Sequence, residues 1–149
     1  MRSIDTRIDI DAEPEAVWAT LVDFERYPEW NPFITSIEGE LRVGGRLRVR
    51  LVPPGGRGMV MRPVVQTVEA RLRVGWLGHL LVPHVFDGAH EFVIEARGPG
   101  ASTFVQRERF GGLLVPLVGR VLDRTHQGFE AMNAALKARV EAQSRAHVA

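Results

Sequence analysis

Residues 24–33 read FERYPEWNPF, a run that combines four aromatic side chains with two prolines. Proline lacks an amide hydrogen and is tolerated only in the first turn of a helix. Pro28 and Pro32 therefore restrict this run to a short helix or turn, which passes through Tyr27 and Trp30. The run separates two parts of the chain that have different patterns.

The residues before this run predict a strand and a first short helix. Residues 2–10 alternate apolar and polar side chains, with Ile4, Ile8 and Ile10 on one side, which is typical of a strand. Pro14 suits the first turn of a helix, and the acidic residues around it favour the positive end of the helix dipole. We therefore expect one strand followed by two short helices.

The residues after this run change pattern twice. Between 34 and 110, glycine and proline turns separate short runs rich in Val, Leu and Phe, which predict about six antiparallel strands. Apolar residues then recur at helical spacing and predict a helix from about 115 to about 142, roughly 40 Å long. Residues 143–149 are expected to be a frayed tail.

Two glycines lie inside the predicted C-terminal helix, Gly119 and Gly128. Each costs about 1 kcal/mol there relative to alanine. Two interpretations stay open: a close backbone approach or bend, or space for a ligand beside Phe129.

Composition excludes several classes of protein. A chain of 149 residues fits one domain, and the absence of cysteine excludes disulfides and thiolate chemistry. A net charge of +1 provides no field that would gather nucleic acid, and Arg46, Arg48 and Arg50 alternate with apolar residues as on the solvated face of a strand. The sequence shows no secretory signal and no apolar run of membrane-spanning length, so we expect a cytoplasmic protein.

Three polar side chains are predicted to point into the apolar interior. In residues 86–94 and 104–110 the even positions are mostly apolar, whereas the odd positions carry most of the charges. By this alternation His90, Gln106 and Glu108 point inward with the aromatic residues.

The connection between these two runs predicts their register. It is centred near Pro99, so a simple hairpin places His90 opposite Glu108, Phe92 opposite Gln106 and Ile94 opposite Phe104. Directly opposed residues have β-carbons roughly 4.5–5.5 Å apart, which allows a hydrogen bond between His90 and Glu108. A shift by two residues would place Gln106 or Phe110 opposite His90 instead.

An inward carboxylate beside an imidazole can act as a general acid or base. Alternatively, His90, Gln106 and Glu108 satisfy one another and shape the polar end of a binding cavity, since buried polar groups are normally hydrogen-bonded. Both interpretations stay open. The other histidines show no metal-ligand spacing, and no phosphate-binding loop or serine-nucleophile motif occurs, so we expect no metal and no cofactor.

Two connections, residues 77–83 and 111–116, are strongly apolar. Connections usually lie at the surface, where large apolar patches are uncommon. We expect them to cover a cavity entrance or to form a dimer contact.

Three segments together resemble the helix-grip superfamily of START-like lipid-transport proteins and polyketide cyclases or dehydrases, also called SRPBCC proteins. They are YPEWNP at 27–32, FDGAHEF at 86–92 and TFVQRERF at 103–110. The resemblance extends from the first strand through the last helix. It implies an α+β helix-grip fold, in which a curved antiparallel sheet of about seven strands wraps around the long C-terminal helix and leaves a hollow between them. The members of this superfamily differ in function, so the fold alone does not choose one.

We therefore expect one ligand-binding domain over residues 1–149, a monomer or homodimer that holds a predominantly apolar, lipid-, polyketide- or steroid-like molecule. The alternatives are a cyclase- or dehydrase-like enzyme that uses Glu108 and His90 as acid and base, and a protein-interaction module that presents the two apolar connections. The residues expected to line the hollow are Met61, Trp76, Phe86, His90, Phe92, Phe104, Gln106, Glu108, Phe110, Phe129 and Met132.

Overall fold

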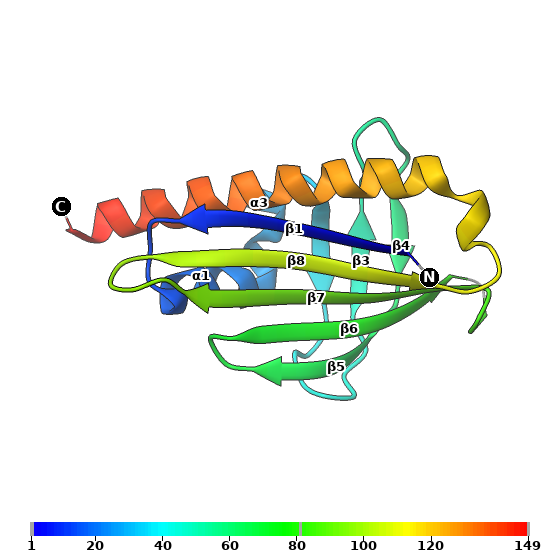
Figure 1. Ribbon diagram of the computed structural model, residues 1–149. Coiled ribbons are helices and arrows are strands. Elements are labelled where there is room, and N and C mark those ends of the chain that lie inside the picture. The colour runs from blue at the N-terminus through cyan, green and yellow to red at the C-terminus, as the bar shows by residue number, and fades with distance from the viewer. Residues whose placement is uncertain (1, 81, 149) are drawn as a thin grey trace.

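The computed structural model describes residues 2–80 and 82–148, and in it eight antiparallel strands are combined with one long C-terminal helix (Figure 1). The strands are β1 (Arg2–Ile10), β2 (Ile34–Glu38), β3 (Arg48–Leu51), β4 (Met59–Met61), β5 (Val64–Glu69), β6 (Arg73–Leu80), β7 (Phe86–Ala96) and β8 (Ser102–Gly111). The helical segments are α1 (Pro14–Val22), η1 (Phe24–Arg26), α2 (Tyr27–Trp30), η2 (Val115–Leu117) and α3 (Gly119–Val148). The predicted α+β fold class is confirmed.

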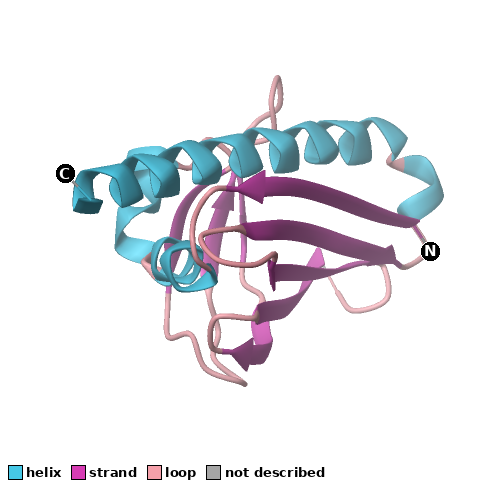
Figure 2. Cartoon of the chain, turned by 60° about the vertical axis from the view of Figure 1, so that its left-hand side comes forward, coloured by secondary structure: helices cyan, strands magenta, loops and turns pink. Residues whose placement is uncertain are grey.

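The strands form two sheets that face each other across the interior (Figure 2). One has the order β1-β8-β7-β6-β5 and the other the order β2-β3-β4. The sequence predicted about six strands after residue 34, whereas the structure has seven, because the run 59–69 contains two. Pro63 separates β4 from β5, since proline cannot donate a hydrogen bond within a sheet, and the two strands join different sheets.

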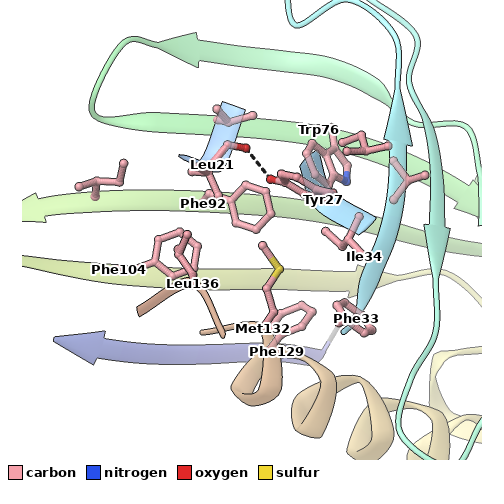
Figure 3. Packing of buried hydrophobic residues seen from close by; sticks show 14 of the residues in the cluster. Leu21, Tyr27, Phe33, Ile34, Trp76, Phe92, Phe104, Phe129, Met132 and Leu136 are labelled. Atoms are coloured by element: carbon pink, nitrogen blue, oxygen red, sulfur yellow. Dashed lines mark hydrogen bonds between the residues drawn. The ribbon is translucent and has the colours of Figure 1, made fainter. Parts of the chain in front are cut away.

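The run at 24–33 folds as short helices that are fixed by side-chain hydrogen bonds. The fully buried Tyr27 hydroxyl donates to the carbonyl of Leu21 at 2.5 Å (Figure 3). The Asn31 carboxamide oxygen accepts from the amides of Phe33 and Ile34 at 3.0 and 2.8 Å. These bonds hold α1, α2 and the start of β2 together. Burial raises the pKa of Tyr27 far above its ordinary value.

Helix α3 lies along β1 and turns one apolar face toward the sheets (Figures 1 and 3). Phe129, Met132 and Leu136 on that face are fully buried. A β-carbon at Gly128 would collide with the ring of Phe33, which packs edge-on against Phe129 at 5.6 Å between ring centroids. Close approach therefore explains Gly128, and the space beside Phe129 is occupied by Phe33.

The last helix differs at both ends from the predicted range of 115 to 142. The η2 turn precedes it, and α3 then continues to Val148 through the residues that were expected to fray. Gln143 accepts a hydrogen bond from the Thr20 hydroxyl at 3.0 Å, which ties the last turns to α1. Residue 149 of the predicted tail lies outside the described residues. Among the described residues, no helix is long and apolar enough to span a bilayer.

Candidate ligand-binding site

The hairpin of β7 and β8 has the register that the sequence predicts. His90 lies opposite Glu108, Phe92 opposite Gln106 and Ile94 opposite Phe104. The His90 imidazole is 5% exposed, and its Nδ1 lies 3.2 Å from a carboxylate oxygen of Glu108, whose side chain is 14% exposed. Hydrogen bonding to this carboxylate favours the tautomer of neutral His90 that carries its proton on Nδ1. The other ring nitrogen, Nε2, is then free to accept a hydrogen bond.

Aromatic side chains fix the orientation of the His90 ring. Trp76 stacks on it with 4.9 Å between centroids and 14° between planes. Phe92 and Phe129 contact it edge-on at 4.6 and 5.2 Å. Within this cage His90 Nε2 is buried and has no hydrogen-bond partner among the described residues. An unpartnered buried polar atom costs roughly 1–3 kcal/mol, so a ligand that supplies a partner would recover part of that cost.

A small hollow lies against His90, between the two sheets. Its volume is about 20 Å³. The residues that line it are Phe33, Ile34, Val49, Leu51, Met61, Pro63, Trp76, Gly78, Gly88, His90 and Glu108. Such a volume holds about one water molecule, whereas pockets for small ligands typically have roughly 300–1,000 Å³. Side chains therefore fill most of the space that the fold leaves between its sheets.

For two glycines in the wall of this hollow, the nearest atoms to an added β-carbon are the ends of flexible side chains. Gly78 and Gly88 are paired across β6 and β7. A β-carbon at Gly78 would lie 2.8 Å from the terminal methyl of Met61, and one at Gly88 would lie 2.5 Å from a carboxylate oxygen of Glu108. Rotation of the Met61 and Glu108 side chains would therefore enlarge the hollow without movement of the strands.

Gln106 belongs to a different group of buried polar residues. Its Nε2 donates to the Asn133 carboxamide oxygen at 2.9 Å, and Asn133 Nδ2 donates to the Thr6 hydroxyl at 2.9 Å. Thr6 donates in turn to the Gln106 main-chain carbonyl at 3.2 Å. Gln106 does not line the hollow, so the predicted trio separates into the His90–Glu108 pair and a bridge between β1, β8 and α3.

The sequence pattern also indicates the other two residues of this bridge, Thr6 and Asn133, which the sequence analysis did not name. Thr6 shares the inward parity of Ile4 and Ile8 in β1, and Asn133 lies one helical turn after Phe129 on the buried stripe of α3. Each is a polar residue at a position whose neighbours on the same face are apolar, which is the pattern that identified Gln106.

The other predicted lining residues divide into two groups. Met61 and Trp76 line the hollow, together with His90 and Glu108. The remaining aromatic residues and Met132 pack in the core and do not line it: Phe86, Phe92, Phe104, Phe110, Phe129 and Met132. Arg46, Arg48 and Arg50 are exposed as predicted. Val49 lies between two of them in the sequence and therefore points inward, but the sequence analysis did not include it among the lining residues.

The two apolar connections lie side by side at one end of the molecule (Figure 1). The amide of Leu113 donates to the His84 carbonyl at 3.2 Å, and the amide of Leu114 donates to the Val85 carbonyl at 3.0 Å. Residues 77–80 of the first connection are part of β6, and residue 81 lies outside the described residues. Gly78 lines the hollow, but no other described residue of these connections does, so their contact with a cavity entrance is not supported.

The other histidines near this end are exposed. His79 Nδ1 lies 2.6 Å from Asp87, and this hydrogen bond, with that from the His84 amide, holds the pKa of Asp87 below its usual value. In residues 2–80 and 82–148 no three His, Cys, Asp or Glu side chains are grouped so that they could hold a metal ion.

Comparison with solved structures gives similar folds over nearly the whole chain. The aromatase/cyclase Zhui from Streptomyces sp. R1128 superposes with a TM-score of 0.81 and 16% identity, covering 98% of this chain and 97% of that one. A START superfamily protein from Mycobacterium smegmatis gives 0.76 and 20%, covering 95% and 98%. Norcoclaurine synthase from Thalictrum flavum, solved with dopamine and hydroxybenzaldehyde, gives 0.71 and 14%, covering 93% and 86%. At these identities the likeness establishes the fold alone.

Comparison at the level of sequence identifies the family. No protein among those with curated descriptions matches the chain. The profile of the family described as "Polyketide cyclase / dehydrase and lipid transport" matches residues 1–141. The chain therefore belongs to the polyketide cyclase/dehydrase and lipid transport family, as the resemblance of its three motifs predicted.

Proposed function

We propose that this protein binds a predominantly apolar small molecule that carries a hydroxyl group, held between the two sheets beside His90. The observation that carries the proposal is the buried, unpartnered Nε2 of His90, a residue that lines an apolar hollow. With its proton on Nδ1 toward Glu108, Nε2 accepts a hydrogen bond from a ligand hydroxyl. The apolar lining favours a lipid-, polyketide- or steroid-like skeleton.

Entry of such a ligand requires the hollow to widen, because about 20 Å³ does not hold it. Met61 and Glu108 are the side chains whose displacement costs least, since it is their flexible ends that lie closest to the two glycines. Methionine has three rotatable bonds and adapts readily to irregular apolar shapes. The ligand would take the place of the Met61 methyl group and approach His90 past Gly78.

Probe binding with a plugged hollow tests this proposal. Gly78→Val places a branched side chain in the wall that Met61 covers, whereas Gly75→Val in the same strand adds it on the opposite face. Titration with the fluorescent apolar probe N-phenyl-1-naphthylamine should show saturable binding to the native protein and to Gly75→Val, and much weaker binding to Gly78→Val. Equal affinity for all three proteins would overturn the proposal.

A second candidate function is acid–base catalysis on the same ligand, as in a cyclase or dehydrase. The specific observation in its favour is the 3.2 Å contact between His90 and Glu108, which can hold and return a proton at Nε2. Glu108→Gln would keep the size of the side chain and change binding by roughly 1–2 kcal/mol at most. Turnover of a true substrate would fall about 100- to 10,000-fold, because glutamine cannot support the imidazolium that forms. Undiminished turnover would exclude Glu108 from the chemistry.

A further inference from the structure

The β6–β7 and β8–α3 connections meet at one end of the molecule (Figure 1), and the residues of these connections and of the start of α3 include exposed apolar side chains. We call them the apolar end patch, and they are Val82, Leu113, Leu117 and Val121. Leu113 and Leu117 are 81% and 79% exposed, although leucine is one of the residue types most often buried. Backbone hydrogen bonds from Leu113 and Leu114 to His84 and Val85 join the two connections that carry Val82, Leu113 and Leu117, and Val121 follows in the first turn of α3.

Three arginines lie at the end of α3 next to this patch, and the acidic residues Asp123 and Asp87 lie at the same end. Arg120 and Arg124 occupy the first two turns of α3, next to Val121, and both are exposed. The Arg2 guanidinium lies 3.7 Å from the position of a β-carbon at Gly119, which places it at the same helix end. Among the described residues none of these three arginines has a carboxylate partner, and Asp123 is the only acidic residue in those two turns. The positive end of the α3 dipole adds to the field.

We propose that the apolar end patch docks on the surface of an anionic lipid bilayer. The surface of such a bilayer has a charged head-group layer above the acyl chains. The exposed leucines would enter the boundary of the acyl chains, and the guanidinium groups beside them would bind the lipid phosphates. A second copy of this chain fits less well, because a symmetric contact would bring the same arginines together. The proposal does not depend on whether the hollow beside His90 takes a ligand.

The experiment is co-sedimentation of the full chain with phosphatidylcholine vesicles that contain one quarter phosphatidylglycerol, and with pure phosphatidylcholine vesicles. We expect binding to the anionic vesicles that weakens as salt rises, and little binding to the neutral ones. The double variant Arg120→Gln/Arg124→Gln should bind about 25-fold more weakly, at about fivefold for each arginine. Leu113→Ser/Leu117→Ser should also lose binding, since it removes the inserted side chains.

Matched controls use the same substitutions elsewhere on the surface. Leu72, exposed in the β5–β6 turn, and Arg48, exposed on β3, lie away from the patch. Leu72→Ser and Arg48→Gln should bind vesicles like the native protein. The proposal is overturned if the protein does not bind anionic vesicles, or if patch and control variants lose binding equally. It is also overturned if the patch substitutions only convert a dimer to a monomer, or only abolish binding to an acidic protein. All patch variants should bind N-phenyl-1-naphthylamine as the native protein does, which separates this proposal from that for the hollow.

Discussion

Exchange of Asn133 for leucine tests whether the buried bridge between β1, β8 and α3 stabilises the fold. Asn133 makes two hydrogen bonds of 2.9 Å, to Gln106 and to Thr6. Gln106 is completely buried, and its carboxamide oxygen already lacks a partner among the described residues. Asn133→Leu therefore leaves the whole carboxamide unpartnered. Only the amide donor of Gln106 is newly unsatisfied, because the oxygen lacks a partner in the native protein as well. At about 1–3 kcal/mol for such a group, we expect the free energy of unfolding to fall by about 1–3 kcal/mol.

The second half of this test is the double variant. Replacing both partners by apolar groups of similar shape can be nearly neutral, because no buried polar group is left alone. Gln106→Met/Asn133→Leu should therefore cost at least about 1 kcal/mol less than the sum of the two single variants. Thr6 keeps its bond to the Gln106 main-chain carbonyl in every variant.

Urea unfolding monitored by circular dichroism measures these differences. Gln66→Met, on the exposed side of β5, is the matched control and should stay within about 0.5 kcal/mol of the native protein. Additive effects within about 0.5 kcal/mol would refute the coupling. Gln106→Met should leave probe affinity unchanged, because Gln106 does not line the hollow; weaker probe binding would contradict its assignment to the bridge.

Three further predictions concern single side chains. Tyr27→Phe removes the hydrogen bond to Leu21 and should lower the free energy of unfolding, measured in urea, by about 0.5–1.5 kcal/mol. Because burial raises the pKa of Tyr27, the native protein should lose stability as pH rises above about 10, whereas the Tyr27→Phe variant should not. Tyr27 is the only tyrosine in the sequence, so tyrosinate absorbance should appear together with unfolding and not before it. Because the pKa of Asp87 is lowered in the folded protein, its contribution to the free energy of unfolding is present above about pH 3.9 and is lost as pH falls through the folded pKa. Hydrogen exchange should therefore show reduced protection of the His84 amide in acid, and Asp87→Asn should remove this pH dependence. Gly88→Ala should push Glu108 away from His90 and shift the ¹⁵N signals of the His90 ring. Gly78→Ala, whose one close contact is the Met61 methyl group, should not shift them, and equal shifts would contradict the contact between Glu108 and His90.

The sequence predicts those features that depend on local alternation and on short connections. The register of β7 and β8 follows from the short turn centred near Pro99, because a simple hairpin of fixed length permits only a few pairings. The helical period beyond residue 118 likewise predicts α3, although not its full length. The exposed arginines and buried Val49 of β3 follow from the same alternation.

The features that the sequence does not predict depend on contacts between distant elements. The sequence groups Gln106 with His90, but its hydrogen-bond partner is Asn133 of α3. The sequences of β7 and β8 do not determine how α3 is rotated over the sheet. The division of residues 59–69 between two sheets depends on where β4 finds a partner. The size of the hollow depends on how Met61 and Glu108 fill the space over Gly78 and Gly88, which only packing determines.

The most direct test of the proposed binding site is ¹⁵N NMR of His90 during titration with 2-naphthol and with 2-methoxynaphthalene, which lacks the hydroxyl. Both ligands should bind saturably, but 2-naphthol should bind more tightly by about 0.5–1.5 kcal/mol, the usual value of one hydrogen bond. Only 2-naphthol should give the large shift of the Nε2 signal that reports a hydrogen bond to that atom. The account is contradicted if neither ligand binds while the spectrum remains that of a folded protein, or if bound 2-naphthol leaves Nε2 unchanged.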